Sequence, residues 1–372
     1  MRIILVNQFA PPDEAPTAVL MGELGAHLRA CGHEVEFIEA GQDYRKADRG
    51  ARDRIFRELR AHASILWRLA TARRADAIIA LSSPPCLLFT AAAGAWLHGA
   101  KLGHWAMDVY PEIAAALGEI GHGGRTYRLT DAAMAWGYAR CRWIAALDAD
   151  MARRLAQRGA KPTGIVPPWP PEGIASGNLD PAPAGAGAGD RPDFTWLYSG
   201  NLGRAHEWET LLDAQAILED RLGDAAPRLV FQGAGPCVPP ARERAEALRL
   251  QRCEFRGYAP RGELIPALLA ADVLIATQRP EAAGLLCTEQ TGGHEIAPRA
   301  ILWVGDPRGH RPRDGSAPRR LRARRCRRRR RLGRGRDGAR ADARRRPHGR
   351  GARRRGARDG FFRWRWWLRA SA

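Results

Sequence analysis

Short aliphatic runs alternate with amphipathic segments along the first half of the chain. Residues 3–6 and 77–81 are continuous apolar runs, which are typical of strands covered on both faces in a parallel sheet. Leu20, Leu24 and Leu28 recur every four residues and mark one face of a helix. The same pattern predicts further strands over 35–38, 102–107 and 143–147, and further helices over 51–74, 86–99, 125–139 and from Asp150.

The composition changes over residues 167–192, which contain seven prolines and five glycines. This composition predicts a flexible linker. A second alternation follows, with strands expected over 194–198, 228–232, 253–256, 272–276 and 300–304, and helices over 207–222, 240–250 and 261–270. Strands that alternate with helices predict an α/β fold with parallel sheets. We therefore expect two Rossmann-like domains, 1–166 and 193–306, that face a cleft, which is a common place for a ligand.

The positive charge of the chain lies almost entirely in its last segment. The formal charge is +20, but residues 307–372 contain 27 arginines, no lysine and four acids, so that the other 306 residues carry a charge of −3. This balance excludes a basic nucleic-acid-binding body, and we expect no specific nucleic acid partner. The segment 307–372 lacks apolar periodicity and repels itself, which predicts disorder.

Membrane spans, secretory leaders and disulfide frameworks leave no signal in the sequence. No apolar run approaches the about 18–20 residues of a bilayer span, and the short aliphatic run after Arg2 is too small for a signal peptide. The seven cysteines are scattered without a CxxC pair, which argues against a zinc site and for a reducing compartment. We expect a cytoplasmic protein that holds no metal.

Two glycine-rich turns are expected at the carboxyl edge of the second sheet. The first joins a strand to a helix and contains Gly200, Asn201, Gly203 and Arg204. The second follows the next strand and contains Gly233 and Gly235. Glycines let the backbone approach an anion, free N–H groups at a helix start attract it, and an arginine pairs with phosphate. Each turn alone is equally well a plain tight turn, but two that converge favour a nucleotide diphosphate site.

Carboxylates stand in two other loops of the predicted fold. Glu281 lies between Arg279 and Gly284 and offers acceptor oxygens for hydroxyl groups, with a plain exposed turn as the alternative interpretation. Asp108 and Glu112 directly follow a predicted strand of the first domain. Carboxylates at such an edge bind or deprotonate a hydroxyl group. The alternative is a structural role for both as residues of a helix start.

The helix expected over 51–74 displays large apolar side chains as well as arginines. These apolar residues are Ile55, Phe56, Leu59, Ile65, Leu66 and Trp67. A solvated helix face is the simpler interpretation of the arginines. The functional interpretation is an interfacial helix that leans on anionic lipid.

Together, stretches from both domains resemble the GT-B glycosyltransferases, specifically the glycosyltransferase family 4 enzymes of bacterial surface-polysaccharide assembly. The matching stretches are VNQFAPPDEAPTA, LSSPP, MDVYPEIAAALG, YSGNLGRAHEWETLL, AADVLIATQRPEAAGLL and AILWVGDP. The resemblance implies a retaining transferase without metal or cofactor. Its donor would be a nucleotide-diphosphate sugar, of the UDP-N-acetylhexosamine type, and its acceptor a lipid-linked sugar or a glycan at the inner face of the membrane.

The resemblance also assigns roles by position. The donor side comprises Gly200, Asn201, Gly203, Arg204, His206, Gly233, Gly235, Arg279 and Gly284. Glu281 matches the first carboxylate of the family's Glu-x7-Glu pattern, which grips the transferred sugar. Asp108 matches the acceptor-side acid, and it is accompanied there by Tyr110, Glu112 and Thr17. His206 stands where many relatives carry a lysine, so the grip on the diphosphate would be weaker or pH-dependent.

The resemblance breaks off after Leu286. Relatives continue with Pro-Ser-Lys-Leu, whereas residues 288–291 read Thr-Glu-Gln-Thr. A shift of one base in ACN-GAR-CAR-ACN permits CCG-AGC-AAA-CTG, which encodes Pro-Ser-Lys-Leu. We infer that residues 288–298 and 308–372 are out-of-frame translation from a frameshift. On this hypothesis Glu289 matches the family pattern by accident, the closing part of the second domain is missing, and activity is impaired.

Two other functions stay open at the level of sequence. The GT-B fold also serves nucleotide-sugar 2-epimerases, which would use the same donor site without an acceptor. Alternatively, the arginine-rich segment 307–372 with its aromatic end binds an anionic polymer such as RNA, or an anionic membrane, by charge and stacking.

Overall fold

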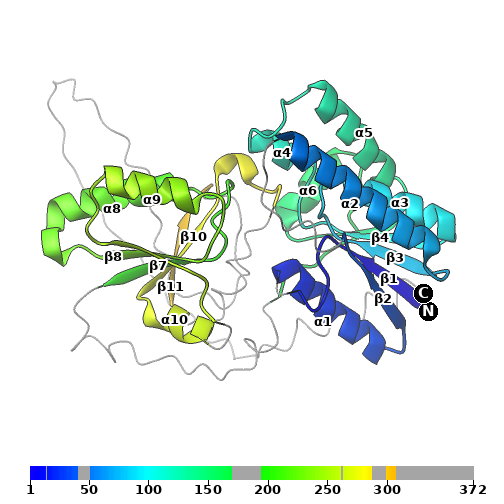
Figure 1. Ribbon diagram of the computed structural model, residues 1–372, viewed down its shortest axis with the longest axis horizontal. Coiled ribbons are helices and arrows are strands. Elements are labelled where there is room, and N and C mark those ends of the chain that lie inside the picture. The colour runs from blue at the N-terminus through cyan, green and yellow to red at the C-terminus, as the bar shows by residue number, and fades with distance from the viewer. Residues whose placement is uncertain (14, 41–50, 170–193, 261–262, 287–298, 307–372) are drawn as a thin grey trace, which may run out of the picture. The chain divides into compact units, whose positions relative to one another are not determined.

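The computed structural model describes residues 1–13, 15–40, 51–169, 194–260, 263–286 and 299–306 (Figure 1). Within these segments, strands and helices alternate along the chain and the strands form two sheets. All strand pairs within the two sheets are parallel. The prediction of an α/β fold built on parallel sheets is therefore confirmed. Most of the predicted linker (170–192), the segment 288–298 and the arginine-rich segment 307–372 lie outside the described residues.

The first sheet has the strand order β2-β1-β3-β4-β5-β6. Its strands are β1 (Arg2–Val6), β2 (Glu34–Ile38), β3 (Ala77–Ala80), β4 (Lys101–Trp105), β5 (Cys141–Ala146) and β6 (Gly164–Ile165). Its helices are α1 (Pro16–Ala30), α2 (Ala51–Thr71), α3 (Leu87–His98), α4 (Glu112–Ala116), α5 (Arg125–Tyr138) and α6 (Ala149–Gln157). The chain reverses its direction across the sheet between β1 and β3, which is the point where such sheets bind ligands.

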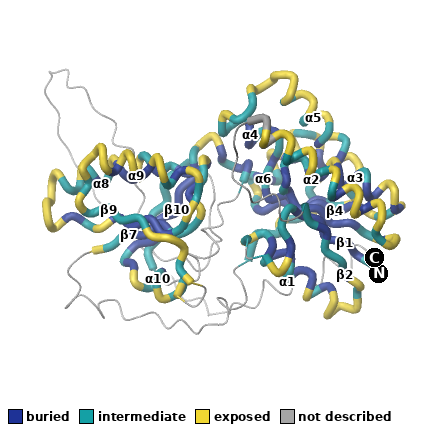
Figure 2. The backbone as a smooth tube through the Cα atoms, viewed as in Figure 1, coloured by how far each residue is buried: buried dark blue, intermediate teal, exposed yellow. Residues whose placement is uncertain are grey.

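Helices cover both faces of this sheet, with α1 on one face and α2, α3 and α5 on the other (Figure 1). This arrangement explains why the central strands are aliphatic along their whole length. Ile4 of β1 pairs in register with Ile78 of β3, and both side chains are fully buried. The burial of these strands stands out along the backbone tube in Figure 2.

The second sheet has the strand order β11-β10-β7-β8-β9. Its strands are β7 (Thr195–Ser199), β8 (Arg228–Gln232), β9 (Cys253–Arg256), β10 (Val273–Thr277) and β11 (Ala300–Val304). The helices are α8 (Trp208–Leu222), α9 (Val238–Ala247) and α10 (Leu264–Ala270), with short 3₁₀ turns at η2 (Gly223–Ala225) and η4 (Pro280–Ala282). This is the Rossmann order, and its reversal lies between β7 and β10.

Alternate residues of β7 pack in two different core clusters, one on each face of the sheet. Trp196 and Tyr198 pack in the larger core cluster of this sheet with residues of α8 and α9. Leu197 packs in a second cluster with Leu268 of α10 and Leu274 of β10. Figure 1 accordingly shows α8 and α9 on one face of the sheet and α10 on the other. Because β7 is packed on both faces, the position of its carboxyl end is fixed, and with it the start of the loop that follows.

The structure differs from the sequence-based prediction mainly in short elements. Helix α4 was expected only as the alternative interpretation of Asp108 and Glu112 as residues of a helix start, which is confirmed for Glu112 in its first turn. Strand β6 was not expected, since its two residues are too few for a pattern. Helix α2 ends at Thr71, earlier than the expected residue 74, and α9 begins two residues early, at Val238. Among the helices described, none combines the length and apolarity needed to cross a bilayer.

Candidate functional site

Three loops meet at the carboxyl edge of the second sheet around the β7/β10 reversal. They follow β7 (residues 200–206), β8 (233–237) and β10 (278–283). In open parallel α/β sheets this edge, at the reversal of strand order, is where ligands bind. The two glycine-rich turns predicted from the sequence are the first two of these loops, and Glu281 belongs to the third.

The two glycine-rich turns are packed directly on each other. The N–H of Gly200 donates to the carbonyl of Gln232 across 2.9 Å, and the N–H of Leu202 donates to the carbonyl of Ala234 across 2.7 Å. Gly233 has φ +138°, and a Cβ there would lie 2.0 Å from the carbonyl oxygen of Gly200. No other residue type fits this conformation and this spacing. Glycine at position 233 is therefore required by the contact between the turns.

Gly235 is constrained in the same way by the first turn. Its φ is also +138°, and a Cβ there would lie 2.5 Å from the carbonyl oxygen of Leu202. The N–H of Cys237 donates to that same carbonyl across 3.0 Å, and the hydroxyl of Tyr198 donates to the carbonyl of Asn201 across 2.9 Å. The turns thus form one double loop, and the glycines at positions 233 and 235 are required by the contact between the two turns.

His206 ties the double loop to the end of β10. Its Nδ1 donates to the carbonyl of Thr277 across 2.8 Å, and the hydroxyl of Thr277 accepts from the N–H of Glu207 across 2.9 Å. Burial lowers the pKa of His206 below its ordinary value, more strongly than the bond to Thr277 raises it. The ring is therefore neutral at pH 7, and its Nε2 is an acceptor. At this position the chain supplies no positive charge to a diphosphate, unlike the lysine of the resembled family.

The two predicted donor-side arginines differ in their surroundings. Arg279 donates from Nη2 to the carboxylate of Glu209, in the first turn of α8, across 2.6 Å. Its N–H donates to the carbonyl of Ala205 across 2.7 Å. The side chain of Arg204 is 57% exposed, and its Nη1 lies 3.8 Å from the carboxylate of Glu119. Arg279 is thus held in place as part of the loop framework, whereas Arg204 extends from the double loop into solvent.

Glu281 lies in the 3₁₀ turn η4 and is exposed. Within the described residues no hydrogen bond or ion pair to its carboxylate is present, so both oxygens face solvent. The adjoining segment is fixed by Gln278, whose Nε2 donates to the carbonyl of Leu286 across 2.9 Å. Gly284 has φ +72° and is buried against the Cβ of Asp150. The backbone around Glu281 is therefore anchored while its carboxylate stays available.

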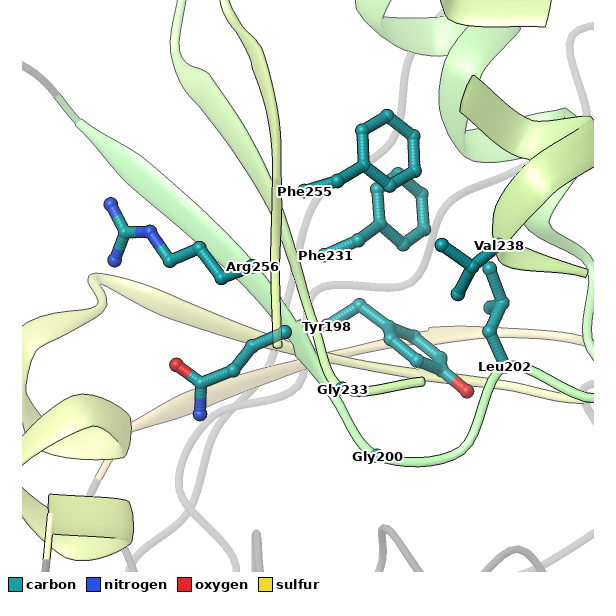
Figure 3. Close-up of a pocket in the computed structure, with 9 residues that line it drawn as sticks. Tyr198, Gly200, Leu202, Phe231, Gly233, Val238, Phe255 and Arg256 are labelled. Carbon is teal, nitrogen blue, oxygen red and sulfur yellow. The ribbon is translucent and has the colours of Figure 1, made fainter. Parts of the chain in front are cut away.

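A shallow recess opens beside the double loop at the ends of β7, β8 and β9 (Figure 3). It is small, and its lining residues are Tyr198, Gly200, Leu202, Phe231, Gln232, Gly233, Val238, Phe255 and Arg256. The rings of Phe231 and Phe255 stack with their centroids 5.0 Å apart. Figure 3 shows the side chain of Arg256 directed away from these rings. Phe231 is buried and the guanidinium of Arg242 lies over the ring of Phe255 at 5.0 Å, so the two rings belong to the core beside the recess.

Asp108 follows β4 of the first sheet and is partly buried. Desolvation raises the pKa of its carboxyl group to about 6. Its N–H donates to Oγ of Ser82 across 3.1 Å, and Asp108 forms an isolated antiparallel bridge with Leu286. The neighbouring N–H of Val109 donates to the carbonyl of Leu285 across 2.7 Å. The segment that carries Glu281 therefore continues into direct backbone contact with the Asp108 loop.

The other predicted acceptor-side residues have different environments. Burial raises the pKa of Tyr110 well above its ordinary value, and the neighbouring acid Asp108 raises it further. Glu112 accepts from Arg158 Nη1 across 2.9 Å and pairs with its Nε across 2.8 Å. Arg158 also donates to the carbonyl of Tyr110 and to the carboxylate of Asp131. Glu112 thus holds the loop in place through Arg158.

Thr17 lies in the first turn of α1, where its hydroxyl accepts from Nδ2 of Asn7 across 3.2 Å. Asn7 directly follows β1 at the reversal point of the first sheet and is fully buried. Its Oδ1 has no hydrogen-bond partner among the described residues. The first sheet therefore also presents polar groups at its ligand-binding edge.

Several residues of these edges were missed by sequence reasoning. Asn7 has a usable signal, since it is the first polar residue after an aliphatic strand. Ser82 lies two residues after β3 and Thr277 ends β10, but nothing in the sequence pairs them with Asp108 or Glu207. Arg158 gives no signal, because its partners Glu112 and Asp131 lie far away in sequence.

Metal ligands do not gather in the part of the chain that the structure describes. No group of three or more His, Cys, Asp or Glu side chains there is placed to hold a metal ion. The five described cysteines are unpaired, and burial raises the pKa of Cys86 to about 11.

Comparison by sequence finds no relatives: no protein-family model matches the chain, and no curated protein is significantly similar to it. Comparison by structure, in contrast, finds similar solved proteins. HepE of Anabaena, in complex with UDP-glucose, is 14% identical, with a TM-score of 0.53 over 82% of this chain and 81% of that one. Sucrose-phosphate synthase of Thermosynechococcus elongatus is 12% identical, with a TM-score of 0.56 over 82% of both chains. The catalytic domain of starch synthase IV of Arabidopsis thaliana, bound to ADP and acarbose, is 13% identical, with a TM-score of 0.55 over 82% of this chain and 83% of that one.

These neighbours are glycosyltransferases of the GT-B fold. Each match extends over more than four fifths of both chains, so it includes both sheets and not one alone. The chain therefore has a GT-B-like fold, as the sequence resemblance implied. At these levels of identity the likeness establishes the fold only.

Proposed function

We propose that the chain is a glycosyltransferase that moves a sugar from a nucleotide diphosphate to an acceptor hydroxyl. The observation that carries the proposal is the double loop at the β7/β10 reversal, where Gly233 and Gly235 pack against the loop that holds Gly200. Several N–H groups of this double loop are bonded to its own carbonyls, but within the described residues those of Asn201 and Arg204 are not, so they can donate to a diphosphate, and the side chain of Arg204 adds a charge there. HepE was solved with UDP-glucose and starch synthase IV with ADP, which supports a nucleotide ligand for this fold.

The proposed donor side uses backbone and side chains of the second sheet. Gly200, Asn201, Gly203 and Arg204 hold the diphosphate. The exposed carboxylate of Glu281 accepts hydrogen bonds from the hydroxyls of the transferred sugar.

The proposed acceptor side centres on Asp108. A carboxyl group with a pKa of about 6 is ionised at pH 7 and is a stronger base than an ordinary aspartate. In the transfer, the bond from the anomeric carbon to the diphosphate oxygen breaks and a bond to the acceptor oxygen forms. The electron pair leaves with the nucleoside diphosphate, and the acceptor proton passes to Asp108. No metal or cofactor takes part in this scheme.

The finer features of the proposal follow the sequence resemblance. They are retention of configuration, a donor of the UDP-N-acetylhexosamine type, and a lipid-linked or glycan acceptor in the synthesis of cell-surface polysaccharide at the inner face of the membrane. The frameshift also stays a proposal, since 288–298 and 308–372 lie outside the described residues. The in-frame segment between them does supply β11, which pairs with β10 in register from Ala300 to Val304.

The experiment that tests the proposal is product analysis with radiolabelled UDP-sugars, on the chain as it stands and on a version with the frame restored. Transfer of label to an added lipid-linked or oligosaccharide acceptor, and only in its presence, is the expected result. Conversion of the donor into an epimeric UDP-sugar without any acceptor would make the chain an epimerase instead. Absence of both reactions in the restored version would remove the proposal.

A further inference from the structure

Large apolar side chains are exposed on two neighbouring helices of the first sheet. On α2 they are Ile55, Phe56, Leu59, Leu66 and Trp67, and on α3 they are Phe89, Trp96 and Leu97. We call this set the α2–α3 apolar surface. Trp67 is 71% exposed and Trp96 is 76% exposed. Soluble proteins seldom leave so many large apolar side chains together in solvent without a partner for them.

Helix α2 carries two apolar faces, of which the fold uses only one. Ala61, Ile65 and Leu69 recur at helical spacing and are buried against the rest of the domain. The exposed residues recur with the same spacing on the opposite side, as Leu59 and Leu66 illustrate. Figure 2 accordingly colours residues of both α2 and α3 as exposed. Packing within the domain therefore does not account for the second face.

The charges around this surface are positive on balance. Among the side chains of α2 that the structure describes, Arg57, Arg60 and Arg68 stand against Asp53 and Glu58, and α3 contains no acidic residue. Arg60 and Arg68 are exposed on α2. On the far side of α3, the ring of Phe89 lies 5.3 Å from that of Trp136, over which the guanidinium of Arg140 sits at 3.7 Å. Aromatic and aliphatic side chains are thus bordered by arginines.

We propose that the α2–α3 apolar surface docks the protein on a bilayer that contains anionic lipid. Helices that lie in a membrane interface combine apolar side chains with a basic border, and tryptophan favours the level of the headgroups. Anionic headgroups complement the arginines, whereas a second copy of this chain on the same surface would bring arginines against arginines. The surface is separate from the double loop of the second sheet, so this inference does not depend on the proposed transfer reaction.

The test is sedimentation of the full chain with vesicles of phosphatidylcholine alone and of phosphatidylcholine mixed with phosphatidylglycerol. Two independent variants remove parts of the surface: Phe56→Ser with Trp67→Ser on α2, and Trp96→Ser with Leu97→Ser on α3. The control is Ile217→Ser with Leu222→Ser, two exposed apolar residues of α8. All substituted side chains are exposed, and thermal unfolding without vesicles is measured for each protein so that unfolding is detected separately.

The arginine-rich segment 307–372 also attracts anionic lipid, and salt separates the two contributions. At about 1 M salt the Debye length falls to about 3 Å, which screens charge attraction but not apolar burial. At this salt concentration we expect wild type and the control to bind the mixed vesicles measurably. Both surface variants should not bind them. At physiological salt each surface variant should bind about tenfold more weakly or worse.

Three results would overturn the proposal. The first is binding of both folded surface variants equal to that of wild type, which assigns binding to residues 307–372. The second is no binding of wild type to the mixed vesicles. The third is a dimer that both surface variants convert to a monomer while vesicle binding is unchanged, which makes a second copy the occupant of the surface.

Discussion

The ring of His206 donates from Nδ1 to the carbonyl oxygen of Thr277 across 2.8 Å, and so joins the loop after β7 to the end of β10. These two strands flank the point where the order of the second sheet reverses. The bond is buried, and the ring is neutral because burial lowers the pKa of His206. The site loop is therefore held in place by an uncharged histidine whose other nitrogen is an acceptor.

Replacing His206 tests this positioning role. His206→Leu leaves the carbonyl of Thr277 without its donor in a buried place, which should cost about 1–3 kcal/mol of unfolding free energy. His206→Asn keeps a donor near the position of Nδ1 and should recover most of that loss. Urea unfolding at pH 7.5 measures both. Equal stability of the leucine variant and wild type would show that the bond does not hold the loop.

Gly233 should tolerate no side chain. In Gly233→Ala the new Cβ would meet the carbonyl oxygen of Gly200 at 2.0 Å, with φ at +138°, so the double loop has to separate. A loss of about 2–4 kcal/mol of unfolding free energy is expected from the clash and the strain together. Gly257→Ala is the matched control, because nothing lies within 4 Å of a Cβ there. A Gly233 variant as stable as the control would contradict the described packing.

Two arginines, Arg153 in α6 and Arg158 just after it, form ion pairs that differ in exposure, and their variants compare a partly buried network with a surface pair. Arg158 is 11% exposed and holds Glu112 and Asp131, so Arg158→Gln leaves these carboxylates unpaired and should cost about 2–4 kcal/mol of unfolding free energy. Arg153 is 67% exposed and pairs with Asp150 on the surface, so Arg153→Gln should change stability by less than about 1 kcal/mol. Denaturant unfolding of both variants provides the comparison. Equal losses would refute a special role for Arg158 in fixing the Asp108 loop.

Titration of the Asp108 carboxyl group should affect the rate of sugar transfer by the frame-restored protein. If its ionised form takes the acceptor proton, kcat/KM should fall as the pH drops below about 6. Asp108→Asn should be at least about a hundredfold slower and should lack this acidic limb. Glu112→Gln, which weakens only the grip of Arg158, should keep the limb. If kcat/KM of Asp108→Asn still fell at low pH as in wild type, another group would be responsible for that fall.

The pH dependence of the unfolding free energy tests the raised pKa of the Asp108 carboxyl group independently of activity. Its folded pKa is raised, so protonation favours the folded state, and this contribution is lost as the pH rises from about 4 through 6. Asp108→Asn should therefore be more stable than wild type at pH 8, where the wild-type carboxylate is charged, but not at pH 4. Greater stability of the variant at both pH values would mean that burial is not what shifts the pKa.

The architecture was largely predictable because its strands are buried on both faces. Such strands are continuous aliphatic runs, as at Ile4 and Ile275, and they are visible without any partner in view. Helix α4 was only an alternative interpretation because its five residues are too few for a periodic pattern. The ends of α2 and α9 moved by a few residues because tertiary packing, and not propensity alone, decides where a helix stops.

The candidate site was predictable in its parts but not in its contacts. Gly200, Gly233 and Gly235 were recognised as turn residues, and the sheet order then brought their loops together. The bond between His206 and Thr277 joins residues far apart in sequence, and no local pattern indicates it. The exposed second face of α2 was visible from the sequence, but that only one of its two faces is buried depends on how the helix packs.

The central claim is that the double loop of the second sheet binds a nucleoside diphosphate. Calorimetric titration of the frame-restored chain with UDP, and in parallel with ADP and GDP, measures this directly, with Gly233→Ala and Gly257→Ala as the paired variants. We predict micromolar binding of at least one of the three nucleotides, unchanged in Gly257→Ala and at least about tenfold weaker in a folded Gly233→Ala. Failure of all three nucleotides to bind, or equal binding by both variants, would contradict the account.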